Sequence, residues 1–267
     1  MSSPPYRKSL RVVPISKMRP HEETVQSLAE TLGRSLRDEG VQRDPVILDE
    51  ATGTILDGTH RAEALRRAGA KSVLAFLVDY HDPQVKLYRW CRFVKEPAES
   101  AASAILNELG LERFGTSPRE TLLAHPERLL VTYRGESFRR SEATVEDEIG
   151  LMRKFDVAAS RLSLKVEFVD EAVADNATSG AADLFLFPPK FGKADVLRAA
   201  AEGRLFPPKS TLHVFPYRPL GVGYPLEELL AGRDVLDEVL GSRQPKLLEE
   251  STNHRGRNYR ERVLVFE

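Results

Sequence analysis

The sequence predicts a mixed α/β protein, in the broad sense that includes α+β folds, with two domains. In its first hundred residues, short apolar segments typical of β-strands alternate with amphipathic segments typical of helices. The chain has 267 residues, which is enough for two domains or one large one. Hydrophobic residues make up 41% and charged residues 30%, as in ordinary globular proteins.

The composition argues against several classes of protein. No apolar run is long enough to span a bilayer, and residues 1–5 lack the apolar core of a signal peptide, so we expect a cytoplasmic protein without a membrane partner. The single cysteine, Cys91, allows neither an internal disulfide nor a thiolate zinc site. With 39 basic and 40 acidic residues, the net charge of −1 offers no general attraction for a polyanion.

A strand is predicted at Leu10–Ile15, followed by a helix that begins at Glu22 or Glu23 and ends at Glu39. Apolar side chains recur along one face of this helix, and the following glycine ends it. Glu22 would then lie at a helix N-terminus, where the helix dipole stabilises a carboxylate by a few tenths to about 1 kcal/mol. This structural role is the alternative to a catalytic role for Glu22.

Residues 46–69 carry the pattern on which the functional prediction depends. Two short strands, at 46–48 and 54–56, are joined by a hairpin-type connection. Asp57 and Gly58 then turn the chain, and a helix runs from Thr59 towards Gly69. The strand therefore brings Gly58 to the open end of a helix.

The start of a helix offers unpaired backbone N–H groups and the positive pole of the helix dipole. Gly58 allows a ligand to approach the backbone closely, and His60 and Arg61 add two cationic or donor side chains in the first turn. These features are what a phosphate site needs. The alternative is an ordinary turn, a helix start and a solvated arginine.

The organisation of the chain changes near residue 99, and we place the domain boundary between residues 98 and 99. Before it, a strongly apolar strand is predicted at 72–80, whereas the pattern at 85–94 does not decide between strand and helix. Cys91 is expected to be a small buried residue. Later predicted elements are helices at 99–109, 144–155, 194–201 and 225–240, a hairpin at 132–138, and strands at 163–169, 184–187 and 263–266.

Two further stretches have residue types that suit ligand binding. The prolines at 206–218 exclude a regular helix, and Lys209, Ser210, Thr211 and His213 form a compact set of donors on a loop that suits a carboxylate or phosphate. Arginines cluster at 253–262, where they either contact phosphates or form a solvated face.

Several motifs occur in a fixed order: Met18–Glu22, Asp57–Arg61, Val78–Tyr80 and Val85–Trp90, followed by the loop Phe206–His213. Together they resemble the ParB/sulfiredoxin superfamily, and more narrowly its free-serine kinases, which make O-phospho-L-serine from serine and ADP or ATP. The resemblance spans roughly residues 10 to 218. It implies a ParB/sulfiredoxin-like nucleotide-binding domain at 1–98 and a second mixed α/β domain at 99–267, which contributes the substrate loop and forms a cleft with the first.

The resemblance also implies roles for individual residues. Glu22 matches the catalytic base of the kinases, and Trp90 would form a wall against the amino acid, although a tryptophan often serves only packing. Asp57 would act with Mg²⁺ or as a second carboxylate, and Mg²⁺ with ADP or ATP is the implied cofactor. The implied nucleotide-binding residues are Gly58, Thr59, His60 and Arg61, and the implied amino-acid-binding residues are Trp90, Lys209, Ser210, Thr211 and His213.

The sequence departs from the family pattern at two positions. Thr59 replaces the first histidine of the phosphate motif, and Leu212 stands where the family loop often has an arginine, so the substrate could differ from serine. Sulfiredoxins carry a catalytic cysteine at the place of Thr59, which argues against a sulfinic-acid reductase.

The main alternative is a ParB-like, nucleotide-dependent DNA-binding module. The near-zero net charge and the lack of an evident helix-turn-helix segment make nucleic acid an unlikely partner. The arginine-rich tail is the feature that favours DNA binding. A nuclease would need clustered carboxylates, which the sequence does not supply. The phosphate donor, the hydroxyl acceptor, the oligomeric state and the role of residues 225–267 stay open.

Overall fold

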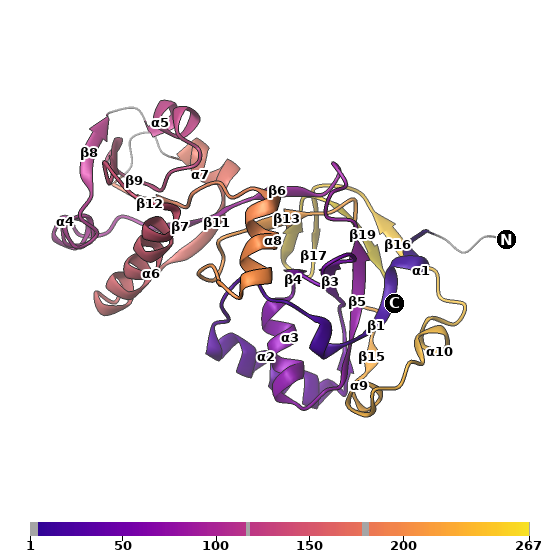
Figure 1. Ribbon diagram of the computed structural model, residues 1–267. Coiled ribbons are helices and arrows are strands. Elements are labelled where there is room, and N and C mark those ends of the chain that lie inside the picture. Colours follow the sequence, from indigo (N-terminus) through magenta and orange to yellow (C-terminus); the bar gives the residue numbers. More distant parts are fainter. Residues whose placement is uncertain (1–4, 116–117, 178–181, 267) are drawn as a thin grey trace. The chain divides into compact units, whose positions relative to one another are not determined.

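The computed structural model describes residues 5–115, 118–177 and 182–266 (Figure 1). The chain forms two compact units. Unit 1 contains residues 1–86, 193–208 and 213–267, and unit 2 contains residues 87–192 and 209–212. This division differs from the predicted boundary at 98/99, because the strand after residue 89 pairs within unit 2 whereas the C-terminal strands pair within unit 1.

The central sheet of unit 1 has the strand order β1-β5-β3-β4. These strands are β1 (Leu10–Pro14), β5 (Ser72–Val78), β3 (Val46–Asp49) and β4 (Ile55–Asp57). β5 is antiparallel to β1 and parallel to β3, and β3 and β4 form the predicted antiparallel hairpin. All four residues of β3 are buried, which explains why its first three residues are apolar without alternation.

Helices α2 (Gln26–Glu39) and α3 (Thr59–Arg67) lie side by side in unit 1 (Figure 1). The prediction for α3 is confirmed, and α2 ends at Gly40 with a left-handed φ of 66°, as expected. The predicted start of α2 at Glu22 or Glu23 is wrong. Residues 19–25 are not helical, because Arg19 and Glu22 form isolated β-bridges with Thr54 and Phe206.

The predicted single helix at 225–240 is also wrong. It is two short helices, α9 (Leu226–Ala231) and α10 (Leu236–Leu240), because Gly232 ends the first with a left-handed φ of 76°. The other helical segments of unit 1 are α1 (Pro5–Ser9), the 3-10 helix η1 (Ile15–Lys17) and α8 (Lys193–Glu202).

The C-terminal segment belongs to unit 1 and is mostly β structure. β19 (Arg262–Val265) lies between β14 (Tyr217–Leu220) and β16 (Lys246–Leu248), parallel to β14 and antiparallel to β16. Two smaller pairs are β2 (Val41–Gln42) with β15 (Tyr224–Pro225), and the hairpin of β17 (Thr252–His254) and β18 (Arg257–Tyr259). The arginine-rich tail is therefore an ordered hairpin.

Unit 2 contains a sheet of the order β11-β7-β12-β9-β10-β8, in which neighbouring strands are antiparallel. Its strands are β7 (Trp90–Val94), β8 (Glu112–Gly115), β9 (Leu130–Tyr133), β10 (Glu136–Arg139), β11 (Glu167–Asp170) and β12 (Leu184–Phe187). The undecided segment 85–94 thus consists of strands, β6 (Lys86–Tyr88) and β7. β13 (Leu212–Val214) follows the loop at 209–211.

Among the described residues, the helices that accompany this sheet are α4 (Glu99–Glu108), α5 (Pro118–Ala124), α6 (Val145–Arg161) and α7 (Glu171–Ala177). α4 and α6 pack their buried faces into one core with β9 and β12. β11 begins at Glu167, later than predicted, because residues 162–164 still close the end of α6 by backbone hydrogen bonds. In the described part of the chain, no helix is long and apolar enough to cross a membrane.

Candidate functional site

We call residues Asp57–Arg61 the phosphate turn, after its predicted role. Gly58 has a φ of +91°, and a Cβ at this position would lie 3.0 Å from Arg61 Nη1 and 3.4 Å from Val46 Cα. Glycine is therefore needed both for the left-handed backbone and for the close approach. Arg61 Nη1 donates to the carbonyl of Pro45 at 2.7 Å, which fixes the first turn of α3 against the residue before β3.

The segment that contains Glu22 runs along the phosphate turn. Nδ1 of the buried His21 lies 2.6 Å from the carbonyl oxygen of Ile55 in β4. Three residues after Glu22, the amide of Val25 donates to Nε2 of His60 at 3.0 Å. These contacts hold Glu22 beside the turn, on the side from which β4 enters it.

Phe206 pairs with the other edge of the same segment. Its amide donates to the carbonyl of His21, and its carbonyl accepts from the amide of Glu23, both at 2.8 Å. The side chain of Glu22 is only 12% exposed, and its Oε1 lies 3.8 Å from His21 Nε2. Glu22 is therefore a largely buried carboxylate on an extended segment, and the predicted helix-dipole role is wrong.

Two buried histidines lie next to each other in unit 1. The rings of His21 and His213 are 5.7 Å apart between centroids, and the hydroxyl of Tyr80 lies 2.8 Å from Nε2 of His213. Burial lowers the pKa of His21, partly offset by Glu22, and lowers the pKa of His213 further below its usual value, helped by His21. Both rings are thus neutral at pH 7, and each can donate or accept a hydrogen bond.

Asp57 is held by Arg218, a residue for which the sequence predicted no role. Arg218 donates from Nη1 to Asp57 Oδ2 at 2.8 Å, and its Nε donates to Glu261. Burial alone would raise the pKa of Asp57, but Arg218, Arg257 and Arg61 together hold it well below the usual range. Asp57 is therefore ionised at any pH at which the protein would work.

A protein-borne metal site does not fit this arrangement. Among the residues that the structure describes, no group of three His, Cys, Asp or Glu side chains could hold a metal ion. The carboxylate of Asp57 already accepts from Arg218. Its ion pair explains the position of Asp57 without a metal.

In unit 2, the predicted substrate residues gather around the start of β7. The ammonium group of Lys209 lies over the ring of Trp90, 5.3 Å from its centroid. The backbone of Lys209 has a φ of +58°, which is unusual for a residue with a side chain. Ser210 and Thr211, which follow it, are buried.

Arg92 explains how Lys209 is held. Its Nη1 donates to the carbonyl of Lys209 at 3.1 Å, and its Nε and Nη2 bind both carboxylate oxygens of Asp156 at 3.1 and 3.0 Å. Arg92 is fully buried and was missed from the sequence. The available signal was an arginine inside the apolar strand Trp90–Val94, since a buried arginine requires a partner.

The structure groups the predicted residues in two sets. Within unit 1 it brings Glu22 together with the phosphate turn, and His213 together with His21. Within unit 2 it brings Trp90 together with Lys209. The set in unit 1 is Glu22, Asp57, Gly58, Thr59, His60, Arg61 and His213, and the set in unit 2 is Trp90, Lys209, Ser210 and Thr211.

The chain has the mixed α+β fold of free serine kinases, whose first domain is ParB/sulfiredoxin-like. It superposes on a variant of a free serine kinase solved in complex with ADP with a TM-score of 0.68 and 25% identity, covering 83% of this chain and 94% of that one. No family model matches the chain.

Two curated relatives are named L-serine kinases. The chain is 26% identical to the ADP-dependent L-serine kinase of Thermococcus kodakarensis, over 81% of this chain and 91% of the relative. It is 27% identical to the ATP-dependent L-serine kinase of Staphylothermus marinus, over 82% and 90%. The predicted resemblance to free-serine kinases is confirmed by these relatives.

Proposed function

We propose that the protein is a kinase that phosphorylates the hydroxyl group of free L-serine, with ADP or ATP as the phosphate donor. The observation that carries the proposal is the position of Glu22, a largely buried carboxylate held beside a glycine turn at the start of α3. Two relatives, matched over 91% and 90% of their length, are named L-serine kinases.

The phosphate turn supplies the positive end of the site. The start of α3 presents backbone N–H groups and the positive pole of the helix dipole, which attract the phosphate groups of a nucleotide. Arg61 uses Nη1 to hold the turn, but a guanidinium carries five N–H donors, so further donors can neutralise charge on the transferred phosphoryl group. The side chains of Thr59 and His60 line the same turn.

Glu22 acts as the general base in this proposal. Its carboxylate accepts the proton of the serine hydroxyl while the serine oxygen forms a bond to phosphorus, and the bond from phosphorus to the bridging oxygen of the nucleotide breaks. Low exposure keeps water away from the carboxylate and so prevents hydrolysis from competing. Asp57, fixed by Arg218, serves as a second carboxylate that orients the turn.

Within unit 2, the amino-acid end is assigned to Trp90, Lys209, Ser210 and Thr211. A cation and two hydroxyl groups suit the carboxylate of serine. The support within unit 2 is the strained backbone of Lys209, which Arg92 holds in place, since such strain gathers at functional sites. Mg²⁺ would arrive bound to the phosphates of the nucleotide.

The test is an end-point assay by mass spectrometry with Mg²⁺, ADP or ATP, and L-serine, L-threonine or L-homoserine in parallel. We expect O-phospho-L-serine with one of the two nucleotides, which identifies the donor. Phosphorylation of another acceptor would keep the mechanism and move the substrate, with Leu212 as the first position to examine. Nucleotide binding without any product would refute the kinase and favour the DNA-binding alternative.

The assignment of the base is tested with Glu22→Gln, and Glu50→Gln is the matched control on the exposed hairpin of the same unit. Glu22→Gln should lower kcat by about 10²–10⁴-fold, the range for losing a general base. ADP affinity should change little in either variant, and Glu50→Gln should keep normal turnover. Near-normal turnover of Glu22→Gln would show that another group is the base.

A further inference from the structure

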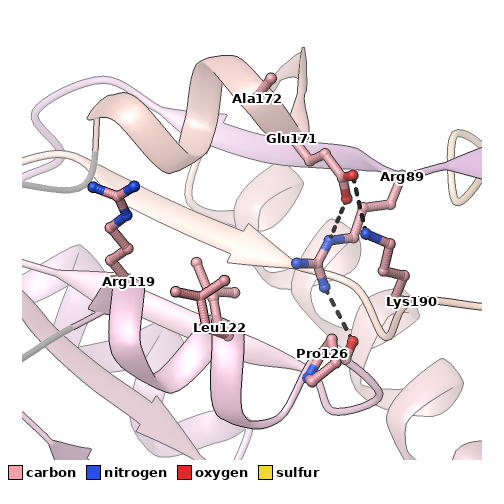
Figure 2. A pocket seen from close by; sticks show the side chains of 8 residues that line it. Arg89, Arg119, Leu122, Pro126, Glu171, Ala172 and Lys190 are labelled. Carbon is pink, nitrogen blue, oxygen red and sulfur yellow. Dashed lines mark hydrogen bonds and ion pairs between the residues drawn. The ribbon is translucent and has the colours of Figure 1, made fainter.

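Unit 2 contains a cavity that the proposed reaction does not use. Its volume is about 500 Å³, within the range of small-molecule sites, and it opens among α5, α7 and the segment after β12 (Figure 2). The residues that line it and carry the argument are Arg89, Arg119, Leu122, Pro126, Glu171 and Lys190.

The wall of this cavity is cationic on one side and apolar on another. Arg89, Arg119 and Lys190 bring three positive charges, against the single carboxylate of Glu171. Leu122, Leu123, Pro126 and Ala172 supply the apolar surface, and Leu123 is left 74% exposed. Such a wall suits a ligand that has an anionic group and an apolar body.

Arg89 is the buried charged residue in the wall of this cavity. It is only 4% exposed, and its guanidinium lies over the ring of Phe187 at 5.6 Å and donates to the carbonyl of Pro188 at 2.6 Å. Its Nε lies 3.0 Å from Glu171 Oε2, and both of these atoms are buried. This ion pair fixes the guanidinium of Arg89 at the wall of the cavity.

The strand register explains why these charges meet. Asp170, the last residue of β11, pairs with Trp90, so the next residue, Glu171, lies beside Arg89 (Figure 2). Lys190, from the segment after β12, adds a second ion pair to Glu171 at 3.4 Å. One carboxylate thus joins two cations, and Figure 2 shows Arg119 on α5 across the cavity from them.

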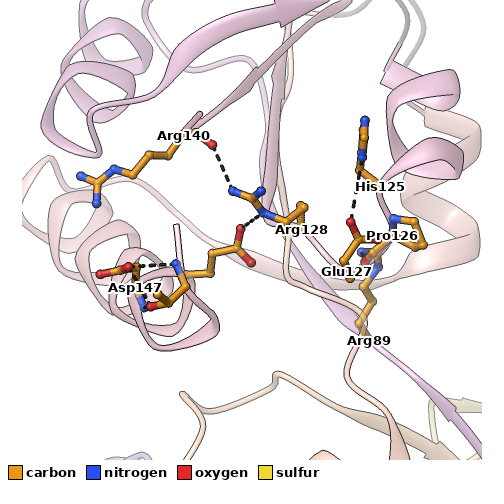
Figure 3. A network of polar contacts seen from close by, with 9 residues as sticks. Arg89, His125, Pro126, Glu127, Arg128, Arg140 and Asp147 are labelled. Atoms are coloured by element: carbon orange, nitrogen blue, oxygen red, sulfur yellow. Dashed lines mark hydrogen bonds and ion pairs between the residues drawn. The ribbon is translucent and has the colours of Figure 1, made fainter. Parts of the chain in front are cut away.

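The loop after α5, which brings Pro126 to the cavity, is held by a polar network (Figure 3). Arg128 donates from Nε to the buried Glu148 at 2.5 Å and from Nη2 to the carbonyl of Arg140 at 3.1 Å. The carbonyl of Pro126 also accepts from the amide of Lys190 at 2.8 Å. This wall is therefore shaped before any ligand arrives.

The cavity and the substrate residues lie on opposite faces of β7. Side chains alternate along a strand, so Cys91 lies on one face of β7 while Trp90 and Arg92 lie on the other. Cys91 packs in one cluster with Leu122 of the cavity wall, whereas Arg92 binds the carbonyl of Lys209.

We propose that this cavity is a second ligand site, which binds a small organic anion: a carboxylate or phosphate group attached to a short apolar body. The charged group lies against Arg119, Lys190 and the part of Arg89 that lines the cavity, and the apolar body lies on Leu122 and Pro126. The site is separate from the phosphate turn, and the proposal does not depend on the kinase activity.

Binding is measured by calorimetry and by the fluorescence of Trp90, the single tryptophan, which is next to Arg89 in the chain. The probes are phenyl phosphate, benzoate and inorganic phosphate, each added to the full chain with ADP in excess to occupy the phosphate turn. The variants are Arg119→Gln, Lys190→Gln and their double variant, all at exposed positions. Lys154→Gln, an exposed charge on α6 outside the cavity, is the matched control.

We expect phenyl phosphate or benzoate to bind with one site and to bind more tightly than inorganic phosphate, because only they use the apolar wall. Each single variant should weaken binding about tenfold and the double variant about a hundredfold, since a charged hydrogen bond contributes about one factor of ten. Lys154→Gln should bind like the unaltered chain. No saturable binding of either aromatic probe, or equal affinity in the double variant, would overturn the proposal. Tighter binding of phenyl phosphate than benzoate would identify a phosphate ester as the preferred ligand.

Discussion

Arg218 is the residue whose replacement should disturb unit 1 most. It is 4% exposed, binds the carboxylates of Asp57 and Glu261, and lies over the rings of Phe215 and Tyr259 at 5.2 and 5.9 Å. Arg218→Met keeps most of the packing volume and removes the charge. It leaves Glu261, whose side chain is 5% exposed, without its cation, and a broken buried pair costs about 3–5 kcal/mol.

The assay is thermal and urea unfolding followed by circular dichroism. For a unit of this size, a loss of about 3–5 kcal/mol should lower Tm by roughly 6–20 °C. Arg262→Met is the matched control, because this arginine lies in the neighbouring strand β19 and pairs with Glu249 at the surface, where such pairs contribute about 0–1 kcal/mol. The double variant with Glu261→Gln should recover part of the loss, since Glu261 then no longer leaves an unpaired buried charge.

The pH dependence provides an independent check on the same ion pair. The folded pKa of Asp57 is below its ordinary value of 3.8, so between the two values the unfolded chain binds more protons than the folded one. Stability from this pair is complete above pH 3.8 and is lost as the pH falls towards the folded pKa. Arg218→Met should flatten this acid slope. A loss of less than about 1 kcal/mol, an unchanged slope, or an equal loss in Arg262→Met would refute the reasoning.

Three further predictions follow from the same geometry. Arg92→Gln should raise KM for the amino acid about tenfold or more with little change in nucleotide affinity, because it releases the loop at 209–211. Equal changes in KM for the amino acid and in Kd for the nucleotide would contradict this. The free energy of unfolding should also fall as the pH drops below 6.5, because His21 and His213 become protonated in the unfolded chain but stay neutral in the folded one. Titration curves by NMR should show both pKa values depressed. Gly58→Ala should cost about 1–2 kcal/mol, because φ is +91° and the new Cβ would lie 3.0 Å from Arg61, and it should weaken ADP binding in calorimetry.

Local sequence patterns were sufficient for the phosphate turn. Strand β4, the glycine at position 58 and helix α3 follow one another within a few residues, and each is determined by short-range backbone preferences and side-chain periodicity. The same holds for the hairpin of β9 and β10, whose turn at Arg134 and Gly135 has positive φ angles. The order of the motifs also carried the resemblance to free-serine kinases.

Boundaries were harder to predict where distant segments compete for the backbone. Glu22 follows a proline and precedes a helical pattern, so its segment looked like a helix start, but pairing with Phe206 keeps it extended. The end of α9 at Gly232 depended on one backbone angle inside an otherwise helical pattern. Tertiary contacts override local preference in the first case. In the second case, the prediction followed the helical periodicity although a glycine interrupts it.

The sequence by itself therefore determined the class of fold and the local structure of the phosphate turn, because each depends on neighbouring residues, whereas Glu22 became the candidate base only through the resemblance to free-serine kinases. Only the tertiary structure decided the partners of the buried charges. Arg218 meets Asp57 across 161 residues, and Arg92 meets the carbonyl of Lys209 across 117. A buried charge must find a counter-charge or a hydrogen bond wherever the fold places one, and no spacing in the chain encodes that position.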